Sequence, residues 1–147
     1  MKPDLSRALQ GVGMTMITKL MPEIQTAFGQ QEAGLAAQLA FWASEEAERG
    51  ADNLVTETRA TRELLQAGLP LAGAAKADVE AALATPAAPN FRLSSLEAEN
   101  DAVRRGLVAL QTALEANASP EAEALNERIW AELIESTRRR QFAVRLG

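Results

Sequence analysis

One long stretch of helix-forming residues indicates the fold, QQEAGLAAQLAFWASEEAERGADNLVTETRATRELLQ at positions 30–66. Ala, Leu, Glu, Arg and Gln dominate it, and these residues have the highest helix propensities. Apolar residues recur along it at helical spacing, which predicts one long helix with an apolar stripe. We expect this helix to pass through Gly50, with a break near Gly50–Asp52 as the alternative. The stripe is Leu35, Leu39, Ala43, Ala47, Ala51, Leu54 and Leu65.

A first helix is predicted on the N-terminal side of this stretch. Asp4 is a suitable N-cap for it. Pro22 should interrupt it, because proline removes a backbone hydrogen bond, and its apolar face should continue to Gly29. The stripe of this helix is Leu5, Leu9, Val12, Met16 and Leu20.

A connection and two further helices are predicted after the long helix. Gly68 followed by a Leu-Pro pair is a stop signal, and a short helix at 77–83 fits within the connection. Ser94 and Glu97 have the spacing of a capping box at the start of the third long helix. Ser119, followed by a proline, is the expected N-cap of the fourth. That helix closes with a run of arginines that suits the helix dipole. The arginines are Arg138, Arg139, Arg140 and Arg145.

The predicted fold class is all-α. No stretch alternates apolar and polar residues with a period of two, so no strand is expected. Each long helix has one apolar stripe, which must be buried against other helices. We therefore expect one domain over residues 1–147, an up-and-down bundle of four main helices with a short crossover helix. Its helical halves are residues 4–67 and 94–145, and the connection is residues 68–93.

The composition excludes several classes of chemistry. The chain has no Cys and no His, so disulfides, thiolate zinc sites, Ser-His-Asp triads and His-ligated haem are impossible. The net charge of -5 argues against a general nucleic-acid binder. The sequence shows neither a long apolar run nor a signal peptide, so we expect no membrane span and a cytoplasmic location. The excess of Arg over Lys, with abundant Ala, is typical of GC-rich bacterial genomes.

No metal site or other cofactor is predicted. Glu45 and Glu48 are one helical turn apart, as are Glu132 and Glu135, and two such pairs could bind Mg²⁺ if they faced each other. A helical chain this rich in Glu contains such pairs by chance. Arg49 also stands where the fuller acidic motif of all-α pyrophosphohydrolases needs a carboxylate.

A row of polar residues lies along one face of the long helix. Glu46, Arg49, Asn53 and Glu57 follow one another at spacings of three and four. They could line a pocket in which Arg49 binds an anion and Glu46 or Glu57 acts as general base. The preferred interpretation is an exposed flank with ordinary helical ion pairs, such as Glu45–Arg49.

Three other features indicate structure or partners. Phe41 and Trp42 point to adjacent sides of the helix, so one of these rings could serve a subunit interface. Asn100 falls on an apolar stripe, and a buried Asn can fix the register between helices. The C-terminal arginines could bind phosphate, although a solvated helix end is the preferred interpretation.

A short segment resembles a known group of proteins. The residues LMPEI at positions 20–24, followed by the Ala-rich helix of Ala36 and Ala37, resemble small uncharacterised bacterial all-α proteins. Those are encoded near acyl-CoA dehydrogenases and phosphotransferase-like kinases. Members of that group tend to carry a His and an Arg where this chain has Phe41 and Trp42. The resemblance implies an accessory role in acyl-CoA metabolism and transfers no catalytic residue.

Three functions are compatible with these observations. The leading hypothesis is a non-catalytic accessory or regulatory subunit, as a homodimer or bound to another protein, because the chain lacks His, a cofactor motif and a Gly-rich phosphate loop. The first alternative is a binder of, or an enzyme acting on, a small anionic ligand held by the polar row. The second alternative is a phasin-like protein that coats a hydrophobic surface, suggested by Ala-rich helices without Cys.

Overall fold

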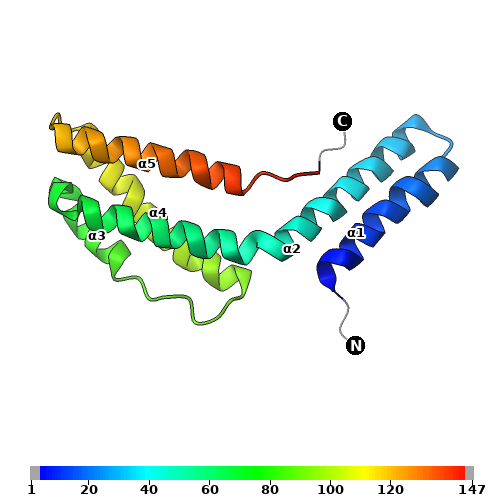
Figure 1. Cartoon of the computed structure of the whole chain (residues 1–147), viewed down its shortest axis with the longest axis horizontal. Coiled ribbons are helices and arrows are strands. Elements are labelled where there is room, and N and C mark those ends of the chain that lie inside the picture. Colours follow the sequence, from blue (N-terminus) through cyan, green and yellow to red (C-terminus); the bar gives the residue numbers. More distant parts are fainter. Residues whose placement is uncertain (1–3, 145–147) are drawn as a thin grey trace. The chain divides into compact units, whose positions relative to one another are not determined.

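The computed structural model describes residues 4–144, and within that range helices are the only regular elements (Figure 1). The all-α prediction is therefore confirmed, and the up-and-down arrangement of four helices stays a prediction. The elements are α1 (Leu5–Thr15), the π-helical turn η1 (Met16–Leu20), the 3-10 turn η2 (Met21–Glu23), α2 (Ala27–Gly68), the 3-10 turns η3 (Leu69–Leu71) and η4 (Gly73–Ala75), α3 (Lys76–Leu83), α4 (Leu93–Glu115) and α5 (Pro120–Arg139).

The chain separates into two compact units that share α2. Of the described residues, the first unit holds 4–50 together with 141–144, and the second unit holds 51–140. α2 continues through Gly50 without a break, so the predicted continuous helix is confirmed and the alternative break is wrong. A single domain over the whole chain stays a prediction.

The helix starts follow local capping. Asp4 caps α1 and Ser119 caps α5, each by accepting a backbone N–H from the first turn, as predicted. α2 begins at Ala27, earlier than predicted, because the Thr26 hydroxyl accepts the N–H of Gly29 at 3.1 Å. This bond places Gly29 inside the first turn of α2 rather than at the end of the preceding helical region.

The capping box predicted at the start of α4 is wrong. The N-cap of α4 is Arg92, whose side chain makes no capping bond, and Ser94 already lies within the helix. The helix begins earlier because the Arg92 carbonyl accepts the N–H groups of Ser95 and Leu96, while Asn90 Oδ1 accepts the Arg92 N–H at 3.0 Å.

α5 is shorter than predicted. It ends at Arg139 with Arg140 as its C-cap, and residues 141–144 are not helical. The predicted helical half that extends to residue 145 is therefore too long, and Arg145 itself lies outside the described residues. The backbone of 141–144 hydrogen-bonds to side chains of α2 instead of continuing the helix.

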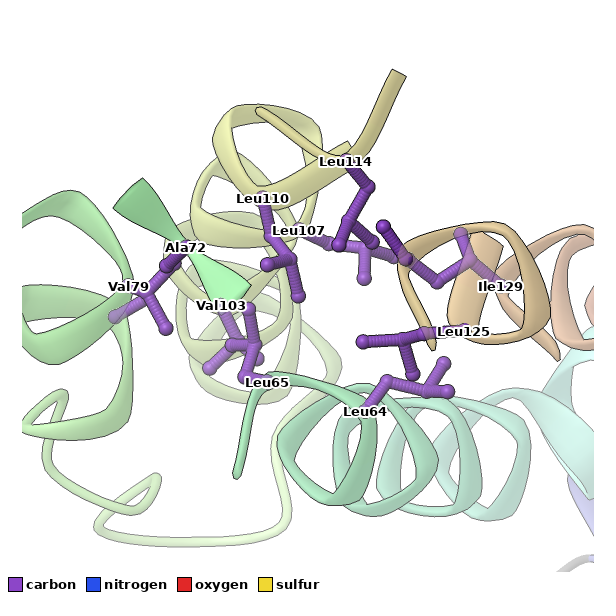
Figure 2. Close-up of a cluster of buried hydrophobic side chains, with 12 residues drawn as sticks. Leu64, Leu65, Ala72, Val79, Val103, Leu107, Leu110, Leu114, Leu125 and Ile129 are labelled. Atoms are coloured by element: carbon purple, nitrogen blue, oxygen red, sulfur yellow. The ribbon is translucent and has the colours of Figure 1, made fainter. Parts of the chain in front are cut away.

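The second unit contains the main hydrophobic core. Side chains from the second part of α2 and from α3, α4 and α5 point toward one another at its centre (Figure 2). α3 and α4 approach most tightly at Gly106, where an added Cβ would lie 2.3 Å from the Cβ of Ala82. The buried core residues are Leu64, Leu65, Ala72, Val79, Ala82, Val103, Leu107, Leu110, Leu114, Ala122, Leu125 and Ile129.

The first unit is a helical hairpin with small residues at its contact face. α1 packs beside the first part of α2 (Figure 1) at Gly13, where an added Cβ would lie 2.9 Å from the Phe41 ring and 3.1 Å from the Ala37 carbonyl oxygen. The hydroxyls of Ser6 and Ser44 are 2.9 Å apart and share a hydrogen bond. The close approach of the two helices therefore depends on residues without large side chains.

The apolar stripe predicted for the long helix is wrong in the first unit. Leu35, Leu39, Ala43 and Ala47 are exposed there. The helix turns Ala37 and Phe41 toward α1, where Gly13 leaves room for the Phe41 ring, and its leucines consequently face outward. In the second unit the stripe is confirmed at Leu54 and Leu65, which are buried.

Candidate functional site

Three side chains of α2 bind the residues that follow α5. We call residues 141–144 the tail, and Trp42, Glu45 and Arg49 the tail-binding residues. The Arg49 guanidinium donates to the carbonyl oxygen of Gln141 at 2.9 Å. The same nitrogen donates to the Glu45 carboxylate at 2.9 Å, so the predicted Glu45–Arg49 ion pair is confirmed.

The other contacts hold the tail along its length. The Glu45 carboxylate accepts the N–H groups of Ala143 and Val144 at 2.9 to 3.1 Å. The Trp42 indole N–H donates to the Val144 carbonyl at 2.9 Å. The Trp42 ring stacks on Phe142, with the ring centroids 5.2 Å apart and the planes 16° from parallel. The tail is thus bound by its main chain and by one aromatic side chain.

The electrostatics of the site favour an ionised Glu45. Burial by itself would raise the pKa of Glu45, but the N–H groups of Ala143 and Val144 and the charge of Arg49 together hold that pKa below its ordinary value. Glu45 is therefore a carboxylate at neutral pH and accepts hydrogen bonds from the tail without needing a proton.

Both aromatic residues predicted for an interface are partly buried within this chain. Phe41 lies against Gly13 of α1, and Trp42 stacks on Phe142 of the tail. A role for either ring between subunits stays a prediction.

Releasing the tail should change the fluorescence of Trp42. The chain has two tryptophans, so a Trp130→Phe background, in which a half-exposed ring is replaced, leaves Trp42 as the reporter. Phe142→Ala removes the stacked ring, and we expect the Trp42 emission to shift to longer wavelength and acrylamide quenching to increase. The control is Phe91→Ala, an exposed ring elsewhere in the chain, which should leave the emission unchanged. An unchanged spectrum in Phe142→Ala would show that the tail is not stacked on Trp42 in solution.

A second polar cluster surrounds Glu57 in the second unit. Glu57 of α2 is 3% exposed, and its carboxylate accepts hydrogen bonds from Arg104 of α4. From α5 and its C-cap it accepts the Ser136 hydroxyl at 2.6 Å and the Arg140 guanidinium at 2.8 and 3.1 Å. One carboxylate therefore joins three helices of the second unit.

Glu57 is held in its ionised form. Its burial by itself would raise its pKa, but the hydrogen bonds from Ser136, Arg140 and Arg104 and the charge of Arg140 outweigh burial and lower the pKa from its ordinary value. A carboxylate with a lowered pKa is a weaker general base. The cluster is therefore suited to joining helices rather than to proton transfer.

The structure does not bring the four predicted ligand-binding residues into one cluster. Glu46 is exposed, Arg49 binds the tail, and Asn53 donates weakly to the Arg139 carbonyl at 3.4 Å. Glu57 belongs to the cluster just described. Each of the last three has a partner within the chain, and their role toward an anionic ligand stays a prediction.

Two long-range contacts could not be found from the sequence. Glu45 was recognisable as the helical partner of Arg49 and as one member of a Glu pair, but nothing local indicates that tail N–H groups reach it. The partners of Glu57, Arg104 and Ser136, are likewise far away in sequence. Asn100 did give a signal, because it stands where an apolar residue is expected: it is buried and donates to the Thr58 hydroxyl at 3.0 Å.

The second unit also has a surface pocket of about 380 Å³ beside α2 and α4. Arg62 and Glu99 on its wall are ion-paired at 3.0 Å, and Arg62 also donates to the carbonyls of Leu83 and Thr85. These charges therefore serve to fix the connection between α3 and α4. In residues 4–144 no group of three or more acidic side chains is placed to hold a metal ion.

The chain matches no protein-family model, no curated protein and no solved structure. The accessory role in acyl-CoA metabolism therefore stays a prediction. Among the described helices, none combines the length and the apolar character needed to cross a membrane.

Proposed function

We propose that this protein is a non-catalytic interaction subunit that forms a homodimer through the outward face of α2. The observation that carries the proposal is a row of exposed apolar side chains on that helix. Phe28 is 70% exposed, Leu35 56% and Leu39 52%. We call these three residues the α2 row.

The spacing of the α2 row supports a helix–helix contact. The three residues are separated by seven and then four positions, which places them on one face of α2. Ala37 is fully buried and faces Gly13 of α1. Because a helix has about 3.6 residues per turn, Ala37 points to the opposite side of α2 from Leu35 and Leu39. The row therefore faces away from α1 and is open to a partner.

A second copy of the chain is the partner that this surface fits. Most soluble oligomers are homo-oligomers, and two-fold dimers pair the same patch on both subunits. Two α2 rows can cover each other across such an axis, with apolar side chains on both sides. Burying large apolar side chains contributes roughly 1.5–3 kcal/mol each, so the row can contribute substantially to association.

The α2 row should control the oligomeric state. We expect a dimeric mass for the wild type by light scattering. A Leu35→Glu, Leu39→Glu variant should dimerise at least about a hundredfold more weakly, because each subunit loses two interface leucines and charges replace them. Val108→Glu is the matched control, since Val108 is 66% exposed but lies on α4 in the second unit. It should remain dimeric.

A monomeric wild type would contradict the proposal. Equal oligomeric masses for the Leu35→Glu, Leu39→Glu variant and the Val108→Glu control would contradict it as well. Binding of a monomeric wild type to hydrophobic particles, lost in the Leu35→Glu, Leu39→Glu variant, would instead favour the phasin-like alternative. Circular dichroism checks that both variants keep the helix content of the wild type.

A further inference from the structure

The tail-binding residues mainly recognise main-chain groups, which any sequence provides. Their hydrogen bonds go to the main chain of Gln141, Ala143 and Val144. In addition, the Trp42 ring stacks on the Phe142 side chain. The surface is therefore suited to a non-helical segment that has an aromatic residue followed by two residues with free N–H groups.

The bound tail is held only at the surface. Gln141 and Ala143 are exposed, while Phe142 and Val144 are partly buried. Segments with few buried contacts and solvent-exposed hydrogen bonds open locally at a small cost in free energy. When the tail is released, Trp42, Glu45 and Arg49 lose the hydrogen-bonding partners that the tail now provides.

We propose that this α2 surface also binds the tail of a second copy, so that two chains exchange tails reciprocally. A second copy presents the aromatic ring and the N–H groups in the sequence that the site already holds. Exchange of an identical segment recovers each contact that opening loses, which is the physical basis of swapped dimers. This contact is separate from the α2 row. It uses the tail-binding residues, and it consists of hydrogen bonds and ring stacking rather than the packing of exposed apolar side chains.

The tail of the same chain competes for the site more effectively than the tail of a second copy. A tethered segment acts at an effective concentration of about millimolar for short linkers. Exchange therefore becomes measurable once closure within the chain is weakened. Two complementary variants weaken closure within the chain, one without the stacking ring on its own tail and one without the stacking ring in its own site.

The acceptor variant is Trp130→Phe with Phe142→Ala. It keeps Trp42 as its one tryptophan, and its own tail lacks the stacking ring. The donor variant is Trp42→Ala with Trp130→Phe. It contains no tryptophan, its own site lacks the stacking ring and its tail is intact. A matched control donor carries Phe142→Ala in addition.

Adding donor to acceptor should shift the Trp42 emission to shorter wavelength and reduce its acrylamide quenching in a saturable manner. The control donor should cause neither change. Equal responses to donor and control donor, or no response to either, would overturn the exchange. A Leu35→Glu, Leu39→Glu background separates this result from dimerisation through the α2 row, because the tail-dependent response should persist there.

A second acceptor variant keeps the test valid if the first acceptor variant does not fold. Ala143→Pro with Trp130→Phe keeps Phe142 but removes a main-chain N–H that Glu45 accepts. Circular dichroism identifies an acceptor that has lost its helices. Failure of both folded acceptors to respond to the intact donor would likewise overturn the exchange.

Discussion

Replacing Leu110 by Ala should lower the free energy of unfolding by about 2–5 kcal/mol. Leu110 is fully buried and lies among the core residues of the second unit (Figure 2). The substitution removes apolar contacts and leaves a cavity that the surrounding core can close only in part. Urea denaturation followed by circular dichroism measures the loss.

The matched control for Leu110 is Val108→Ala on the same helix. Val108 is 66% exposed, so its truncation should change the free energy of unfolding by less than about 0.5 kcal/mol. Equal losses for the two variants would show that α4 does not turn its Leu110 face to the core.

Glu57→Gln should lower the free energy of unfolding by about 2–3 kcal/mol. Removing one partner of a buried ion pair typically costs about 3–5 kcal/mol. The effect here is smaller because the side chains of Arg104 and Arg140 are 43% and 47% exposed, so water can solvate their charges once Glu57 is gone. Glu63→Gln is the control, an exposed carboxylate on the same helix. A loss no larger than in this control would contradict the role of Glu57.

The Glu57 contribution should also depend on pH in a defined direction. The folded-state pKa of Glu57 lies below its ordinary value of 4.5, so the unfolded chain takes up a proton first as the pH falls. The difference in stability between wild type and Glu57→Gln should be constant above about pH 5.5. It should shrink as the pH falls below 4.5 and through the folded-state pKa. A difference that grows on acidification would refute the assignment.

The sequence located the helices well because their signals are local. Asp4 and Ser119 cap helices as predicted, since a cap needs only its own first turn. Ser94 failed although it has the right neighbours, because the backbone bonds around Arg92 start the helix earlier. Competing local solutions of this kind cannot be ranked from residue types alone.

The sequence identified several residues of the candidate sites but not what they bind. Glu57 and Arg49 were recognised as polar residues of interest, but Glu57 proved to join helices and Arg49 to bind the tail. Each outcome depends on groups far away in the chain, such as Ser136 for Glu57. Pairings at such separation are set by how the helices pack, which helical periodicity does not encode.

The sequence by itself determined the all-α class and the caps at Asp4 and Ser119, because propensity, capping and periodicity act within a few turns. The continuity of α2 through Gly50 and the burial of Asn100 were each one of two interpretations that the sequence left open, and the structure decided both. Tertiary structure alone decided which side of α2 faces α1. The side with Ala37 faces α1, and the side with Leu35 and Leu39 is exposed. Gly13 of α1 leaves room there for the Phe41 ring, and a side chain at position 13 would collide with that ring and with the Ala37 backbone. That steric condition placed the α2 row outside, where it can meet a partner.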